Sequence, residues 1–442
     1  MKNLLRAFLI VCLAALCLAA ISSCGEEPAD TTTATITTEA TTTTAPVTTH
    51  PSSELLDYYP LPNGTYAVLA GRAAFLTEIV IPETYNGRAV TAIADQGFSG
   101  CSNLKTITIP DSVTTIDHGA FKGCTGLKSI TISNNVTFIG EYAFYGCTGL
   151  TSVTIGDSVT RIDDYAFYDC TGLTSITIGD SVTTIGDYAF YKCTGLEAVY
   201  ISDISAWCGI SFGDISANPL YYAENLYING EFVTDVVIPD SVTIIDSGLF
   251  HGCTSLTSIT IPDSVTRIDD YAFTGCTGLT SVTIPDSVMS IGDYAFRNCT
   301  SITSITIPDS VKTIGDYAFS GCSNIVSATI PTLVISYISK NNLQTVVITG
   351  GTTIGDNAFD GCTRLTSITI PDSVTTIGNR AFYGCTGLTS ITIPNSVTRI
   401  ESYAFVNCTG VTIYCEAISK PSGWNWAWNY DSRPVVWGCK EN

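Results

Sequence analysis

The chain has 442 residues, of which 19 are Lys or Arg and 40 are Asp or Glu, so its formal net charge is −21. A nucleic-acid-binding protein needs a basic surface that displaces counterions from phosphates, and this composition excludes that class of partner. Charged residues make up only 13% of the chain, so the hydroxyl groups of Ser and Thr must provide much of its polar surface.

The N-terminus has the features of an export signal. Two basic residues precede an apolar run at 7–21, which is shorter than the roughly 20 residues that a membrane-spanning helix needs. The run ends in Ile-Ser-Ser-Cys, which resembles a bacterial lipobox. The resemblance implies a lipoprotein signal peptide over 1–23 and a lipid on Cys24 that anchors the protein to the membrane. An ordinary cleavage site with an incidental cysteine is the alternative.

A threonine-rich segment follows. Twelve of the nineteen residues between Thr31 and Thr49 are Thr. Such a segment has too little apolar surface to offset the entropy lost on ordering. We therefore expect a disordered tether over 24–57 that holds the rest of the protein away from the membrane.

From Leu76 onward the chain repeats itself with a period of 23 residues. One copy, at 279–299, reads Leu-Thr-Ser-Val-Thr-Ile-Pro-Asp-Ser-Val-Met-Ser-Ile-Gly-Asp-Tyr-Ala-Phe-Arg-Asn-Cys. Apolar residues at unit positions 1, 4 and 6 are typical of the strand in a leucine-rich repeat. The fifteen strand starts are Leu76, Leu104, Leu127, Leu150, Leu173, Leu196, Val233, Leu256, Leu279, Ile302, Ile325, Leu343, Leu365, Leu388 and Val411.

Each part of the unit predicts one piece of local structure. Positions 4 and 6 point inward from a strand, and the proline at position 7 ends the strand because it cannot donate to the ladder. A second extended segment follows, and the aspartate at position 15 is expected to cap one helical turn. Since no single unit can bury its apolar face, the units must stack. The predicted fold is an α/β repeat solenoid, a right-handed stack of parallel strands and short helical turns with a cap at each end.

The unit is similar to the repeat of BspA-type leucine-rich-repeat surface proteins. The resemblance covers nearly all of the chain after the tether and implies an adhesin-like role at the cell surface, without naming a ligand. It divides the chain into an N-terminal cap with the first repeat at 58–103, a solenoid at 104–415 and a cap at 416–442. The last segment contains four of the five tryptophans, which we expect to cover the final apolar layer, with a sugar-stacking platform as the alternative.

Departures from the repeat indicate where binding could concentrate. The segment 202–232 is an irregular insertion rich in aromatic residues, and the repeat at 325–342 is shortened. Binding energy usually comes from a few aromatic or arginine residues. We therefore predict an aromatic ligand-binding patch beside a strip of outward threonines, with packing of the insertion onto the solenoid as the alternative. The predicted ligand-binding residues are Trp207, Phe212, Tyr221, Tyr222, Thr260, Thr283 and Thr306.

Twelve cysteines share unit position 21. In register they would stand about 4.8 Å apart with parallel side chains, whereas a disulfide needs Cβ atoms about 3.8 Å apart and convergent. We therefore predict a column of buried free thiols, and no metal site, since no histidine accompanies it. Outside the column, Cys415 and Cys439 bracket the C-terminal segment, and either a disulfide between them or two free thiols fits the sequence.

The sequence contains little that could catalyse a reaction. There are three histidines, none with a nucleophile or acid at a known motif spacing, so we predict no enzymatic activity and no catalytic residues. Aspartates recur at unit positions 8 and 15, and their oxygens could bind calcium, although the spacing of an EF-hand loop is missing. No other cofactor is expected.

Together these features predict an extracytoplasmic, surface-anchored ligand-binding protein that mediates attachment through the face of the solenoid. Its expected partners are a surface protein or glycan of a host or another microbe, and the membrane through the lipid anchor. A glycan-binding protein or a purely structural surface protein is the alternative, and a hydrolase is the least favoured one.

Overall fold

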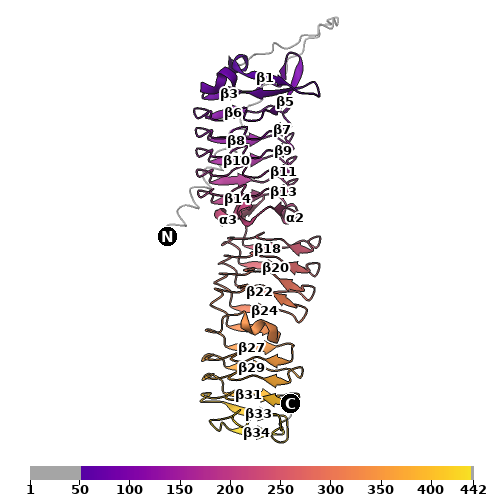
Figure 1. Ribbon diagram of the computed structural model, residues 1–442, viewed down its shortest axis with the longest axis vertical. Coiled ribbons are helices and arrows are strands. Elements are labelled where there is room, and N and C mark those ends of the chain that lie inside the picture. Colours follow the sequence, from indigo (N-terminus) through magenta and orange to yellow (C-terminus); the bar gives the residue numbers. More distant parts are fainter. Residues whose placement is uncertain (1–50, 440–442) are drawn as a thin grey trace, which may run out of the picture. The chain divides into compact units, whose positions relative to one another are not determined.

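The computed structural model describes residues 51–439 (Figure 1). The predicted signal peptide, Cys24 and most of the predicted tether lie outside the described residues. The end of the predicted tether is folded, because the 3-10 helix η1 (Pro51–Leu55) packs on β3 and the N–H of Val80 donates to Ser52 Oγ. An antiparallel hairpin of β1 (Asp57–Pro60) and β2 (Tyr66–Leu69) follows. Residues 51–57, which the sequence assigns to the tether, therefore belong to the folded region.

The first strand of each unit contributes to a front ladder of parallel strands, which is divided into several sheets (Figure 1). These strands are β3 (Glu78–Val80), β6 (Thr106–Thr108), β8 (Ser129–Ile132), β10 (Ser152–Ile155), β12 (Ser175–Thr177), β14 (Ala198–Ile201), β16 (Leu226–Ile228), β18 (Asp235–Val237), β20 (Ser258–Thr260), β22 (Ser281–Thr283), β24 (Ser304–Thr306), β26 (Ser327–Ile330), β27 (Thr345–Ile348), β29 (Ser367–Thr369), β31 (Ser390–Ile393), β33 (Thr412–Cys415) and β34 (Val435–Trp437).

The Val-x-x-Ile segment of each unit contributes a shorter strand to a second ladder. These strands are β5 (Arg88–Ile93), β7 (Thr115–Ile116), β9 (Phe138–Ile139), β11 (Arg161–Ile162), β13 (Thr184–Ile185), β15 (Ser211–Phe212), β19 (Ile244–Ile245), β21 (Arg267–Ile268), β23 (Ser290–Ile291), β25 (Thr313–Ile314), β28 (Thr353–Ile354), β30 (Thr376–Ile377) and β32 (Arg399–Ile400). Two strands close short hairpins, β4 (Thr84–Tyr85) against β5 and β17 (Glu231–Phe232) against β16.

Strand pairing follows the repeat period. Val153 pairs with Ile130 on one side and with Ile176 on the other, each exactly one 23-residue unit away along the chain. Alternation within the strand buries unit positions 4 and 6 and leaves position 5 outward, as in β8, where Ile130 and Ile132 are buried and Thr131 is exposed. The structure is a parallel-strand solenoid of about 16 turns of about 23 residues, which confirms the predicted fold.

Stacked phenylalanines form the centre of the core in three columns, at 98–190, 250–319 and 359–405. Neighbouring rings are nearly parallel, with centroids between 4.9 and 5.5 Å apart. The last of them, Phe405, meets the edge of Trp428, and the indole N–H of the buried Trp424 donates to the carbonyl of Val397 at 3.0 Å. These two tryptophans cover the final layer as predicted for a C-terminal cap.

The expected helical turn at Tyr-Ala-Phe is instead a hydrogen-bonded turn. Its tyrosines have a left-handed backbone, with φ between 55° and 61° from unit to unit. The preceding aspartate does not cap a helix. Its carboxylate accepts the main-chain N–H of the equivalent aspartate in the next unit, as Asp270 does from Asp293 at 2.7 Å. A Cβ at Gly292 would lie 2.4 Å from Asp270 Oδ1, so this ladder needs glycine beside it.

Helices are few among the described residues. Two short α-helices, α2 (Ile204–Cys208) and α3 (Leu220–Ala223), and the 3-10 helix η3 (Ile215–Ala217) form the insertion. The other 3-10 helices are η2 (Gly71–Phe75) near the N-terminus and η4 (Thr332–Ser336) in the shortened repeat. Within residues 51–439, no helix has the length and apolar character that crossing a bilayer requires.

Candidate functional site

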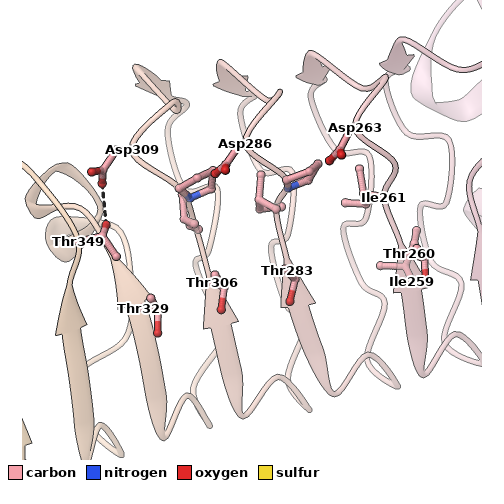
Figure 2. Close-up of a pocket in the computed structure, with 14 residues that line it drawn as sticks. Ile259, Thr260, Ile261, Asp263, Thr283, Asp286, Thr306, Asp309, Thr329 and Thr349 are labelled. Atoms are coloured by element: carbon pink, nitrogen blue, oxygen red, sulfur yellow. Dashed lines mark hydrogen bonds between the residues drawn. The ribbon is translucent and has the colours of Figure 1, made fainter. Parts of the chain in front are cut away.

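A groove of about 780 Å³ crosses the front ladder from β20 to β27. Figure 2 shows a row of threonines on successive strands, with three aspartates beyond the strand ends. We call this feature the Thr–Asp groove. It is lined by Ile259, Thr260, Ile261, Asp263, Thr283, Ile284, Pro285, Asp286, Thr306, Ile307, Pro308, Asp309, Thr329 and Thr349.

The repeat itself positions the polar residues of the groove. Position 5 of each strand points outward, so Thr283, Thr306 and Thr329 stand side by side in paired strands. The proline at position 7 ends each strand, and its carbonyl accepts the N–H of the residue three positions later, as Pro285 does from Val288 at 3.1 Å. The aspartate at position 8 lies in this turn and is exposed to solvent.

One interruption of the ladder and the shortened repeat shape the groove. β20 pairs with β18, whereas β22 pairs with β24 in a separate sheet. Ile259 in β20 is therefore only half-buried, although its equivalents Val282 and Ile305 are buried. At the other end, the shortened repeat lacks an aspartate turn, and Asp309 reaches past it to accept a hydrogen bond from Thr349 Oγ at 2.6 Å (Figure 2).

The structure places the predicted threonines together, but it does not place the predicted aromatic residues on an open surface. Thr260, Thr283 and Thr306 come together on the floor of the Thr–Asp groove. The aromatic patch is wrong as an open binding surface, because Trp207 is only 1% exposed and Phe212 is half-buried against the core.

The other two aromatic residues of the predicted patch are also engaged in packing. Tyr222 is half-buried, and its hydroxyl accepts the main-chain N–H of Lys192 at 3.0 Å. Tyr221 is the most exposed of the four, and its ring stacks on His251 with the centroids 4.9 Å apart.

The insertion joins the repeats before it to those after it. The indole N–H of Trp207 donates to the carbonyl of Leu249 at 3.3 Å, and the buried Asn218 side chain donates to the carbonyls of Gly248 and Leu249. Neither β16 nor β17 pairs with β18, so these contacts replace the missing strand ladder. Buried polar groups need such partners, so Trp207 and Asn218 serve to pack this junction.

His251 provides a pH-dependent test of this packing. Burial lowers its pKa from the usual 6.5 to about 4, and its Nδ1 is buried without a hydrogen-bond partner among the described residues. Between these pH values the unfolded chain binds one more proton than the folded chain, so stability falls as the pH falls. We expect the free energy of unfolding to decrease by about 3 kcal/mol from pH 6.5 to pH 4, since one pKa unit corresponds to about 1.4 kcal/mol. Denaturant titrations across this range measure the change.

The matched control for this measurement is His251→Phe. A phenylalanine keeps a ring against Tyr221 but carries no titratable group, whereas the carboxylates titrate equally in both proteins. The variant should lack the His251 contribution, so the difference between the two profiles isolates it. Parallel profiles of the two proteins from pH 6.5 to pH 4 would contradict the assignment.

The cysteine column is buried, and the structure records its members as free thiols. Most of these thiols donate to the carbonyl of the phenylalanine 26 residues earlier, as Cys147 does to Phe121 at 3.1 Å. Burial raises the pKa of the Cys147 and Cys276 thiols well above the usual range, so they stay protonated. Cys415 and Cys439 are also recorded as free, and the N–H of Cys439 donates to the carbonyl of Cys415 at 3.0 Å.

The aspartates of the repeats lie along lines rather than around a point. In residues 51–439 no group of three or more His, Cys, Asp or Glu side chains is arranged to hold a metal ion. The position-15 carboxylates accept main-chain N–H groups, which offsets the repulsion between like charges at this spacing.

Two features of the surface were not predicted from the sequence. Val237 and Val347 replace threonine at unit position 5 and bracket the groove threonines, with Val237 paired to Thr260 and Val347 to Thr329. The replacement itself is the signal that could have identified them. The second is a ladder of tyrosines on the turns, in which Tyr142 stacks on Tyr165 with the ring centroids 5.0 Å apart.

Comparison with known proteins agrees with this architecture. The sequence model described as "BspA type Leucine rich repeat region (6 copies)" matches residues 74–212, 223–343 and 335–417, which is more than half of the chain. No match to a curated protein was found.

Solved structures include similar bacterial proteins. A leucine-rich repeat protein of Bacteroides ovatus is 29% identical with a TM-score of 0.51, over 87% of this chain and 91% of that chain. A leucine-rich cell surface protein of Faecalibacterium prausnitzii is 26% identical with a TM-score of 0.33, over 89% of this chain and 98% of that chain. With its repeat unit, its strand ladders and the profile match in agreement, the chain belongs to the BspA-type leucine-rich repeat family.

Proposed function

We propose that this protein is anchored at the bacterial surface by a lipid on Cys24 and binds a surface protein or glycan of a host or another microbe. The observation that carries the proposal is the Thr–Asp groove on the strand face, whose floor is formed by outward threonines of consecutive units. Concave surfaces formed by stacked repeats are the usual binding faces of solenoid proteins. The leucine-rich repeat family and solenoid fold are typically non-enzymatic, which favours adhesion over hydrolysis.

The arrangement suits adhesion because contacts from many repeat units can each contribute to the binding free energy. Most units add one outward threonine hydroxyl at position 5, and the groove adds depth where four strands and three aspartates meet. Half-buried Ile259 adds apolar surface to these hydrogen-bonding groups. A ligand that spans the groove would bury apolar area and form hydrogen bonds together, which is how specific interfaces combine affinity with orientation.

Attachment of cells that produce the full chain tests the proposal. Such cells should bind an array of immobilised matrix proteins and glycans saturably. Replacing Thr283 and Thr306 together by Trp fills the groove and should reduce attachment at least tenfold, because the ligand loses the concave surface. Attachment is measured as bound cells against the amount of coated ligand.

The control pair is Thr131→Trp with Thr154→Trp, which lies at the same unit position in the N-terminal half and should leave attachment within about twofold of wild type. Cys24→Ala should release the chain into the medium and abolish attachment, while the released chain competes with wild-type cells. Equal loss in both tryptophan pairs, or no saturable attachment of wild-type cells, would overturn the proposal.

A further inference from the structure

The carboxylates at the rim of the Thr–Asp groove differ in their hydrogen bonds. Asp309 accepts from Thr349, and its carbonyl accepts the Lys312 ammonium at 2.6 Å. In the part of the chain that the structure describes, neither Asp263 nor Asp286 has a side-chain hydrogen bond or an ion pair, and both are exposed. No basic residue lines the groove, so two free negative charges face the ligand space.

Apolar side chains also lie beside the threonines of the groove and beyond each end of the threonine row. Ile259 is half-buried where β20 and β22 lie in separate sheets. Val237 is 66% exposed and Val347 is 36% exposed, and both occupy the row of the groove threonines. The row therefore reads, along the solenoid, an exposed valine, four threonines beneath the aspartates, and a second exposed valine.

The length of this row matches a short extended peptide. Five strand intervals separate Val237 from Val347 in the order of the units, which at about 4.8 Å for each interval is about 24 Å. An extended peptide of eight residues spans about the same distance, at about 3.4 Å for each step. Apolar side chains near its ends would reach the valines, and basic side chains between them would reach Asp263 and Asp286.

We infer that the Thr–Asp groove binds an extended, basic segment of a partner protein, with Lys or Arg in the middle and apolar residues at the ends. Charge complementarity selects this occupant, since the groove is acidic and the whole chain has a net charge of −21. A glycan is less well suited, because sugars stack on aromatic faces and no aromatic side chain lines the groove. The inference rests on the proposed function and specifies its ligand.

Fluorescence polarisation with a labelled octapeptide, Val-Ser-Lys-Ser-Arg-Ser-Ser-Val, tests the inference with the detergent-solubilised full chain. We expect saturable binding that weakens as salt rises, because the contacts at the groove rim are exposed charges. Asp263→Asn with Asp286→Asn should weaken binding at least tenfold. The same peptide with Glu in place of Lys and Arg should not bind.

The matched control is Asp111→Asn with Asp157→Asn, at the same unit position in the N-terminal half. Both pairs remove the same charge, so general attraction to an acidic protein would weaken binding equally in the two. Binding unchanged by the groove pair, or equally changed by both pairs, would overturn the inference.

The two proposals fail in distinguishable ways. Cell attachment could depend on Thr283 and Thr306 although the octapeptide does not bind in a saturable, salt-dependent way. In that case the basic-peptide ligand is wrong and the adhesive function stands. Oligosaccharides that bind in place of the peptide, with loss of binding in the Asp263→Asn and Asp286→Asn pair, would identify the groove as a glycan site and also overturn the inference.

Discussion

Replacing Trp207 by Ala should lower the free energy of unfolding by about 3 to 5 kcal/mol, the usual cost of removing a buried aromatic side chain. Trp207 is 1% exposed, packs against the edge of Phe212, and donates to the carbonyl of Leu249 across a junction where no strand ladder runs. The loss of stability should therefore be largest at this junction between the insertion and the repeats that follow it. Denaturant unfolding gives the total, and amide hydrogen exchange in β14, β16 and β18 locates it.

Trp426→Ala is the control for this substitution. Trp426 is 78% exposed, so its removal should change stability by less than about 0.5 kcal/mol. If Trp207→Ala were as harmless as Trp426→Ala, the insertion would not be the structural joint described above, and an open role for Trp207 in binding would regain support.

Phe296→Ala should produce a loss of similar size, about 3 to 5 kcal/mol, for a different reason. Its ring is fully buried between Phe273 and Phe319, with centroid distances of 5.0 and 5.3 Å. Truncation leaves a cavity between the rings of Phe273 and Phe319. Because the neighbouring units hold these two rings in place, they cannot move together to fill the cavity. Denaturant unfolding of the full chain measures the effect.

Two comparisons separate the column from simple loss of apolar area. Met289→Ala, at a 63% exposed position of the same unit, should have almost no effect. Combining Phe296→Ala with Phe273→Ala should cost less than the sum of the two, because they share one cavity, whereas Phe296→Ala with the distant Phe144→Ala should be additive. Strict additivity of the adjacent pair would contradict direct coupling between the stacked rings of Phe273 and Phe296.

The predicted binding residues show which side-chain positions can be inferred from the sequence and which cannot. Thr260, Thr283 and Thr306 could be placed on one outward row because strand alternation and a constant period leave no freedom at position 5. Trp207 could not be placed, because aromatic residues in an irregular segment serve equally well as anchors for a ligand or as packing. Only the backbone path of α2 and α3 shows which surface they cover.

Cys24 remains a prediction from the sequence, since it lies outside the described residues. The proposed anchor therefore depends on the release experiment and not on the fold.

By itself the sequence determined the repeat period, the inward and outward positions, the buried cysteine column and the family, because a short-range pattern repeated in register specifies its own packing. Only the tertiary structure decided where β20 and β22 separate, how Asp309 reaches Thr349 past the shortened repeat, and that the insertion closes a junction. These features depend on contacts between units that differ from the consensus. Each unit's deviation is visible in the sequence, but its consequence is set by the neighbour against which it packs.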